Sequence, residues 1–161
     1  MGENIFAKFN EMFDVAGLQK DVEEASTNTG FEKKDVPFDD YEVKITKLEL
    51  AACDYDGDYK GMPEAHVWFK IITGEYTGQI LFMTKKLVSL KNPNASGFMI
   101  HKFNEFLDSL ESGIPVTFTD WEQYGELIES IFNAIDGRGE YQLSYFENKG
   151  YKDYTIVKRF Q

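Results

Sequence analysis

The spacing of apolar residues changes along this chain of 161 residues, and each spacing predicts a different kind of element. Over residues 3–25, apolar side chains recur three and four positions apart with charged residues between them, which predicts an amphipathic helix. The polar stretch 26–30 follows, and Pro37 continues no helix. We therefore expect two parts: residues 1–36, an N-terminal amphipathic helix with a polar linker, and residues 37–161, the main domain.

After the linker, apolar and polar residues alternate, as is typical of β-strands. Three segments alternate in this way: residues 40–50, 65–72 and 79–88. In the first, the apolar face changes phase between Ile45 and Leu48. Such a slip at Thr46–Lys47 predicts a β-bulge, where a long strand bends to serve two parts of a sheet.

The second half of the domain predicts two helices and then two strands. Helical spacing returns over residues 97–110 and again from Thr119 to about Asp136, and Thr119-Asp-Trp-Glu122 resembles a capping box. The two last strands are residues 140–147 and 151–160, joined by a tight turn. Three strands, a helical insertion and a closing hairpin is the order of the OB-fold. We expect a mainly β, α+β protein: an OB-like five-stranded barrel with helices inserted between strands 3 and 4, plus the N-terminal helix.

Charge is distributed unevenly along the chain, whose net charge is -11. Residues 65–103 carry five bases and one acid, and residues 141–161 carry four bases and two acids, whereas residues 104–140 carry nine acids and one base. The two basic stretches contain expected strands with aromatic residues between the lysines. A basic, aromatic sheet face in an acidic protein is typical of a surface that holds a polyanion. Single-stranded DNA fits best, because its bases are free to stack.

Trp68 is the strongest single candidate for such a contact. It shares one side of its strand with His66 and Lys70, so a stacking ring and a phosphate contact lie side by side. The whole candidate nucleic-acid-binding set consists of basic and aromatic residues: Lys44, Lys47, His66, Trp68, Lys70, Phe82, Lys85, Lys86, Lys91, Tyr145, Lys149, Lys152, Tyr154 and Arg159. Within it, we expect Trp68 and Tyr154 to stack on bases. The alternative is that Trp68 covers an edge of the core and that the lysines only solvate the surface.

Metal and catalytic motifs are weak in this sequence. Asp54, Asp56 and Asp58 have the spacing that opens a calcium-binding EF-hand loop, but the sixth position is Tyr59 instead of glycine and the twelfth is Ala65 instead of glutamate. An acidic turn is the better interpretation, so no metal site is expected.

The remaining chemistry also argues against an enzyme. Acids and a lysine within residues 39–44 have the residue types of metal-dependent nucleases, but they are consecutive and cannot surround an ion. No phosphate-binding loop, nucleophile elbow or dinucleotide loop is present. Cys53 is the only cysteine, which is typical of a reducing cytoplasm, and no apolar run is long enough to span a membrane. We expect a non-enzymatic cytoplasmic protein without a cofactor.

Three segments carry a resemblance to a known family: residues 36–45, 67–78 and 97–107. With these segments, the chain resembles small bacteriophage and prophage proteins of replication or recombination modules that are associated with single-stranded DNA binding. The resemblance runs from about residue 36 to the end of the chain. It implies an OB-like fold, protection of replication intermediates in the host cell, and phage or host replication and recombination proteins as further partners.

Two hypotheses follow from the sequence. The first is a non-enzymatic single-stranded DNA-binding protein of a phage module. The alternative is an acidic protein-interaction module, an adaptor or inhibitor that binds a basic protein by mimicking the charge of DNA; Glu122, Glu126 and Glu129 along one side of a helix favour it. The sequence leaves open a homo-oligomer and the choice between DNA and RNA.

Overall fold

The structure, a computed structural model, describes residues 33–136 and 138–160. The chain divides into two units, residues 1–33 and 34–161. The helix expected over residues 3–25 and the polar stretch 26–30 lie outside the described residues, so the following account concerns the second unit.

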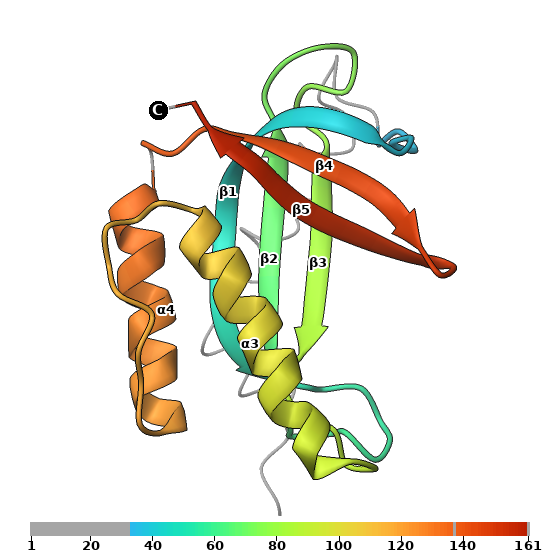
Figure 1. Cartoon of the computed structure of the whole chain (residues 1–161). Helices are drawn as coiled ribbons and strands as arrows, with labels where there is room; N and C mark the ends of the chain where they lie inside the picture. Colours follow the sequence, from blue (N-terminus) through green and yellow to red (C-terminus); the bar gives the residue numbers. More distant parts are fainter. Residues whose placement is uncertain (1–32, 137, 161) are drawn as a thin grey trace, which may run out of the picture. The chain divides into compact units, whose positions relative to one another are not determined.

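The described residues of the second unit form five strands and two helices (Figure 1). In chain order they are β1 (Asp39–Ala52), β2 (Pro63–Ile71), β3 (Ile80–Lys86), α3 (Pro93–Ser109), α4 (Trp121–Ile135), β4 (Tyr141–Asn148) and β5 (Tyr151–Arg159). The strands form one antiparallel sheet in the order β3-β2-β1-β4-β5. The expected α+β class, the five strands and the place of both helices between the third and fourth strands are confirmed. Among the residues that the structure describes, β3 and β5 each pair on one side only, so the sheet is open.

The first strand is long and bent, as the change of phase predicted. It pairs with β4 over residues 39–43 and with β2 over residues 43–52. The register shifts between Ile45 and Lys47, which leaves Thr46 as the extra residue of a bulge. Because of this bulge, Ile45 and Leu48 both reach the core although an odd number of positions separates them.

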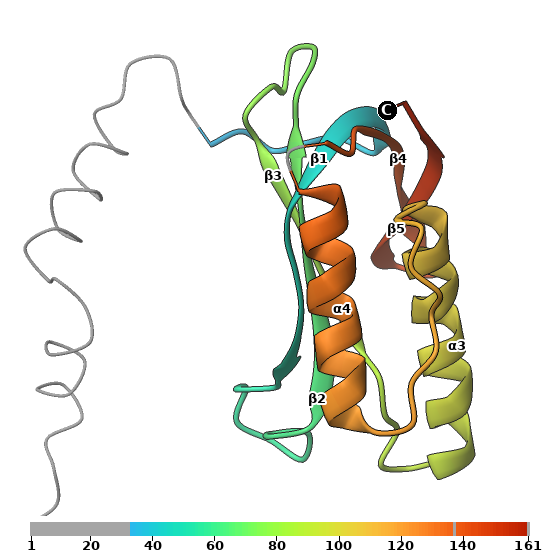
Figure 2. The same cartoon turned by 90° about the vertical axis from the view of Figure 1, so that its left-hand side faces the viewer.

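The core lies on one side of β1, β2 and β3, and both helices lie on that side (Figure 2). Val67, Phe69 and Ile71 of β2 are completely buried there. The hairpin of β4 and β5 crosses over the same side (Figure 1), and the Tyr154 ring stacks on Phe69 at 5.6 Å. The opposite side of β1, β2 and β3 carries neither helix; we call it the outer face.

Two helix starts differ from the prediction. The first helix begins at Pro93, four residues earlier than expected, because proline suits the first turn of a helix. The N-cap of α4 is Asp120 instead of Thr119: its carboxylate accepts a hydrogen bond from the Gln123 backbone N–H at 2.8 Å. Gln123 reaches back and accepts from the Thr119 backbone N–H at 2.9 Å. The arrangement resembles a capping box one residue further along, except that Gln123 accepts from the backbone N–H of the residue before the N-cap.

The closing hairpin turns through Lys149 and Gly150. Both have left-handed backbone angles, with φ of 51° and 82°. Two consecutive left-handed residues form a type I′ turn, whose twist matches that of paired strands. The tight turn predicted at this position is confirmed.

Candidate nucleic-acid interface

Strand pairing arranges the outer face in transverse rows, because directly opposed residues of antiparallel strands project to the same side. Two adjacent rows are basic and aromatic: Lys44, Lys70 and Ile80, then Lys47, Trp68 and Phe82. The next two rows carry the acids: Glu49, His66 and Thr84, then Ala51, Glu64 and Lys86. We call the first two rows the cationic end. The other two rows, with the loop 53–62, are the acidic end.

The aromatic pair of the cationic end is partly open to solvent. The rings of Trp68 and Phe82 meet edge to face, with centroids 5.1 Å apart and planes at 84°. Phe82 is 52% exposed, whereas Trp68 is half-buried. The Lys47 ammonium lies 4.4 Å from the centroid of the Trp68 ring, a cation–π contact. Trp68 is thus not part of the core, and one row presents a cation and two π-surfaces.

The three lysines of the cationic end differ in their ion pairs. Lys44 lies 3.8 Å from Glu140, and Lys47 lies 3.2 Å from Glu49. These pairs are substantially exposed, and such pairs are worth about 0–1 kcal/mol, so a phosphate can compete for the lysines. Lys70 is exposed and has no acid within 4 Å among the described residues. Of the three lysines of the cationic end, Lys70 therefore has the positive charge that neighbouring acids neutralise least.

His66 does not belong with the basic residues, which corrects the prediction. Its Nε2 lies 2.6 Å from a Glu64 carboxylate oxygen, and its Nδ1 lies 3.5 Å from a Glu49 oxygen. Both ring nitrogens thus face carboxylates instead of an incoming phosphate. The cause is the register, which sets Glu49 directly opposite His66 on β1, while Glu64 precedes it by two residues on β2.

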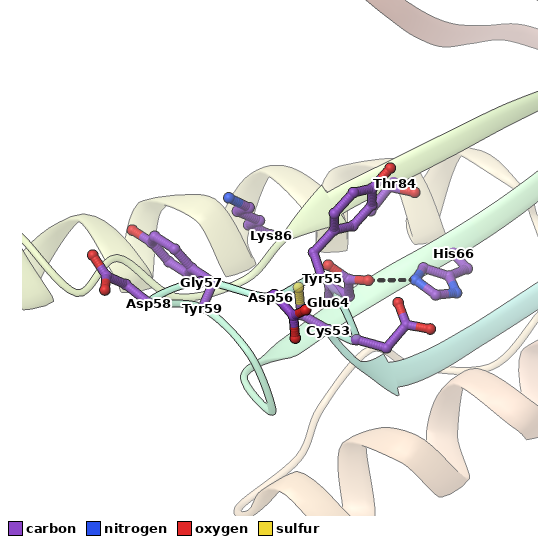
Figure 3. Close-up of a pocket in the computed structure, with 11 residues that line it drawn as sticks. Cys53, Tyr55, Asp56, Gly57, Asp58, Tyr59, Glu64, His66, Thr84 and Lys86 are labelled. Atoms are coloured by element: carbon purple, nitrogen blue, oxygen red, sulfur yellow. Dashed lines mark hydrogen bonds and ion pairs between the residues drawn. The ribbon is translucent and has the colours of Figure 1, made fainter.

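The loop 53–62 closes over the acidic end and forms a cavity of about 530 Å³ (Figure 3). Glu64 is buried at this cavity and points toward His66. Lys86, at the other side, lies 4.1 Å from the Tyr59 ring centroid. The sequence did not reveal that carboxylates surround His66, because the strand pairing that places them there depends on the bulge in β1.

The aspartates of that loop form no recognisable cation site. Asp54, Asp56 and Asp58 are all exposed, and Asp56 pairs with Lys60 at 3.0 Å. Within residues 33–136 and 138–160, no group of three or more His, Cys, Asp or Glu side chains is placed to hold a metal ion. The loop adds negative charge beside the outer face.

Tyr145 and Tyr154 of the predicted set belong to the core, so the predicted stacking of Tyr154 on a base is wrong and Tyr145 does not lie on the binding face. Tyr145 and Tyr154 stack on each other at 5.2 Å, and both are buried. The Tyr154 hydroxyl donates to the Phe82 carbonyl oxygen at 2.7 Å. Burial, with smaller contributions from Tyr145 and Asp153, raises the pKa of Tyr154 to about 12. The reason is the path of the last hairpin, which turns these alternating positions inward.

Lys85 lies on the core side of β3 instead of the outer face. Its ammonium pairs with Asp153 of β5 at 3.1 Å. Burial disfavours the charged carboxylate of Asp153, but hydrogen bonds from the Tyr154 backbone, Asn148 and Lys85 outweigh it and hold the pKa of Asp153 below its usual value. The pair links the two edge strands of the sheet and is not available to the outer face.

The other predicted basic residues are dispersed. Arg159 donates to the Glu111 carbonyl oxygen beside the connection between the helices, so it serves the fold. Lys149 is in the hairpin turn, Lys152 lies opposite Glu147 in the same hairpin, and Lys91 precedes α3; all three are exposed. None of the four lies in the rows around Trp68. Of the predicted set, the structure brings together Lys44, Lys47, Trp68, Lys70 and Phe82.

No protein-family model matches this chain, and neither does any curated protein or solved structure. Of the helices that the structure describes, none is both long and apolar enough to cross a membrane. What the chain binds must therefore be inferred from its surfaces.

Proposed function

We propose that this protein binds single-stranded DNA at the cationic end of the outer face and catalyses no reaction. The row of Lys47, Trp68 and Phe82 carries the proposal. Stacking of a base on an aromatic side chain is worth about 1–3 kcal/mol and tolerates any sequence. Lys47 in the same row, with Lys44 and Lys70 in the adjacent row, supplies cations for the phosphates beside a stacked base.

The fold supports this placement, since we infer that the second unit is an OB-like barrel. The strand order, the bent β1 and the helices between β3 and β4 agree with it. Side chains link the two edges that a closed barrel would pair: Tyr154 to the Phe82 carbonyl, and Lys85 to Asp153. OB-folds bind oligonucleotides on strands 2 and 3, where Trp68 and Phe82 lie.

The overall acidity of the chain is compatible with this function. Charges at a surface are screened over roughly 8–10 Å at physiological salt, so a strand feels the local rows and not the net charge of -11. Glu49 and Glu64 repel phosphates from the β1 and β2 part of the acidic end, which directs the strand to the cationic end and to the edge strand β3. The family resemblance adds the context of phage replication or recombination in the host cytoplasm, with proteins of those processes as partners.

Tryptophan fluorescence tests the proposal. The chain has two tryptophans, so Trp121→Phe leaves Trp68 as the only reporter. Titration with oligo-dT of about 20 nucleotides is expected to quench Trp68 at about 50 mM salt and much less at about 300 mM. The matched variant Trp68→Phe, which retains Trp121, is expected to show no quenching. Absence of binding at low salt, by fluorescence and by anisotropy of a labelled oligonucleotide, would show the proposal to be wrong.

One observation favours a second candidate, the acidic protein-interaction module. Glu122, Glu126 and Glu129 are all exposed along α4, and none lies within 4 Å of a cation among the described residues. A surface of this kind fits a basic protein. The outcome that favours it is no binding to oligo-dT at low salt, together with binding to polylysine that weakens when the three glutamates become glutamines.

A further inference from the structure

A second depression, of about 770 Å³, lies between β3, β5 and α3. It lies along the two edge strands, each of which has no strand partner on this side among the described residues. Both signs of charge line it, with cations in excess: Lys85, Lys86, Lys102 and Lys149 against Glu105 and Asp153. We call it the α3 groove. Its charge favours an anionic occupant.

The α3 groove also offers an exposed aromatic ring. Phe98 is 62% exposed, although phenylalanine is usually buried. The Lys102 ammonium, four residues along the same helix, lies 5.5 Å from the centroid of its ring. An open ring with a lysine over it repeats the combination of Trp68 and Lys47 on the outer face.

The outer face and the α3 groove meet at the end of β3. Thr84 and Lys86 line both the α3 groove and the cavity of the acidic end. Both are exposed, and they follow Phe82 at every second position of β3. A strand that leaves the Phe82 ring therefore crosses β3 at Thr84 and Lys86 and arrives at the α3 groove.

We infer that the α3 groove holds a second segment of the same DNA strand, with Phe98 stacking on a base and Lys102 and Lys149 contacting phosphates. This inference rests on the proposed function. It predicts that binding depends on the length of the oligonucleotide. A short oligonucleotide occupies the cationic end alone, and a longer one also reaches the α3 groove. OB-folds occupy about 4–16 nucleotides, a range that accommodates both cases.

The test compares two oligo-dT lengths, about 6 and about 20 nucleotides, by fluorescence anisotropy with the full chain. The groove variant is Phe98→Ala with Lys102→Ala. The matched control is Phe160→Ala with Lys158→Ala, another lysine whose ammonium lies over a phenylalanine ring, at 5.1 Å. We expect the groove variant to bind the long oligonucleotide about tenfold more weakly and the short one unchanged. For the long oligonucleotide, the plot of log affinity against log salt concentration becomes less steep by about 0.7 for each phosphate that the variant no longer neutralises.

A single variant on another element tests whether the loss in the double variant comes only from local damage to α3. Lys149→Asn removes a groove charge while asparagine suits the left-handed position in the turn. This variant should also bind the long oligonucleotide more weakly and the short one normally, with a smaller loss of affinity than the double variant. Circular dichroism melts verify that each variant is folded.

The outcomes separate this inference from the proposed function. If the unaltered protein binds neither length at low salt, the proposed function fails. If it binds both and the groove variants also bind both normally, only the inference fails. Equal losses at both lengths would also overturn it, because the groove would then be no separate segment. Binding of polyglutamate that needs the groove lysines, without any effect of DNA length, would assign the groove to a protein segment instead.

Discussion

The two ends of the outer face are built from the same three strands and have opposite chemistry. At the cationic end, Lys47 lies against Trp68 and Lys70 stands exposed. At the acidic end, Glu49 and Glu64 enclose His66. Both ends are rows of opposed residues, so neither helix packing nor the core distinguishes them. The difference shows that the side chains set in register across β1, β2 and β3 decide where an anion can lie.

The bulge in β1 creates this difference. Ile45 pairs with Phe69, and without the bulge Thr46 would lie opposite Trp68. The extra residue brings Lys47 to that position instead, and shifts Glu49 to face His66. One inserted residue thus supplies the cation beside the aromatic pair and the carboxylate that keeps phosphate away from His66 in the next row.

The largest expected effect comes from removing the aromatic rings of the cationic end. Trp68→Ala with Phe82→Ala removes two stacking surfaces, each worth about 1–3 kcal/mol, so oligo-dT affinity should fall about 100-fold or more. The matched control is Trp121→Ala with Phe160→Ala, which removes the same two ring types, each 40% exposed, from outside these rows. Fluorescence anisotropy measures both. Equal losses in the two double variants would contradict the distinction between this end and the rest of the surface.

Next in size is the loss of charge at the same end. Lys44→Gln with Lys70→Gln is expected to weaken binding about tenfold at low salt and to lower the salt slope by about 0.7 for each lysine. The comparison variant is Lys91→Gln with Lys152→Gln, two exposed lysines outside these rows. Binding isotherms at several salt concentrations give both slopes. A slope unchanged in the first variant would mean that no phosphate lies at these lysines.

A smaller effect of opposite sign is expected at the acidic end. Changing Asp54, Asp56 and Asp58 to asparagine removes exposed negative charge beside the outer face, and should raise affinity for oligo-dT by about two- to fivefold at low salt. Because these charges are exposed, the gain should disappear at about 300 mM salt. Titration at the two salt concentrations measures it. Weaker binding by this variant would show that the loop contributes favourably to the complex.

Most of the fold could be predicted from the spacing of apolar residues. Alternation in the strands, the change of phase at Thr46–Lys47 and the Asn148–Gly150 turn depend on local chemistry, so the sequence displays them directly. The helix starts were displaced because several residues near each start can serve as cap. Whether the two edges of the sheet come together depends on contacts such as Tyr154 with Phe82, which join residues 72 positions apart.

The candidate site was predicted only in part, for a related reason. Basic and aromatic residue types identify Trp68, Phe82 and Lys70 as members of one face, because alternation within a strand is local. Tyr154 and Lys85 have the same residue types but point to the core side, and only the path of the last hairpin reveals this. The carboxylates around His66 follow from the cross-strand register, which composition does not contain.

The smallest expected effect on binding concerns the lysine with the most buried acid partner. Asp153→Asn breaks the ion pair with Lys85, which joins β3 to β5 away from the outer face. Binding of an oligo-dT of about 6 nucleotides should not change, because that length occupies the cationic end. The free energy of unfolding at neutral pH should fall by about 1 kcal/mol, since a partly buried charged hydrogen bond is removed.

The pH dependence of this destabilisation follows from the lowered pKa of Asp153. The unfolded chain binds a proton near the ordinary value of 3.8, whereas the folded chain does so only at lower pH. Between these two values the unfolded state holds more protons, so stability decreases as pH falls. The advantage of the natural protein over Asp153→Asn should therefore be complete above pH 3.8 and vanish below the folded-state pKa. Urea denaturation across this range measures it; a difference that persists in strong acid would mean that Asp153 stabilises the fold through packing and not through its charge.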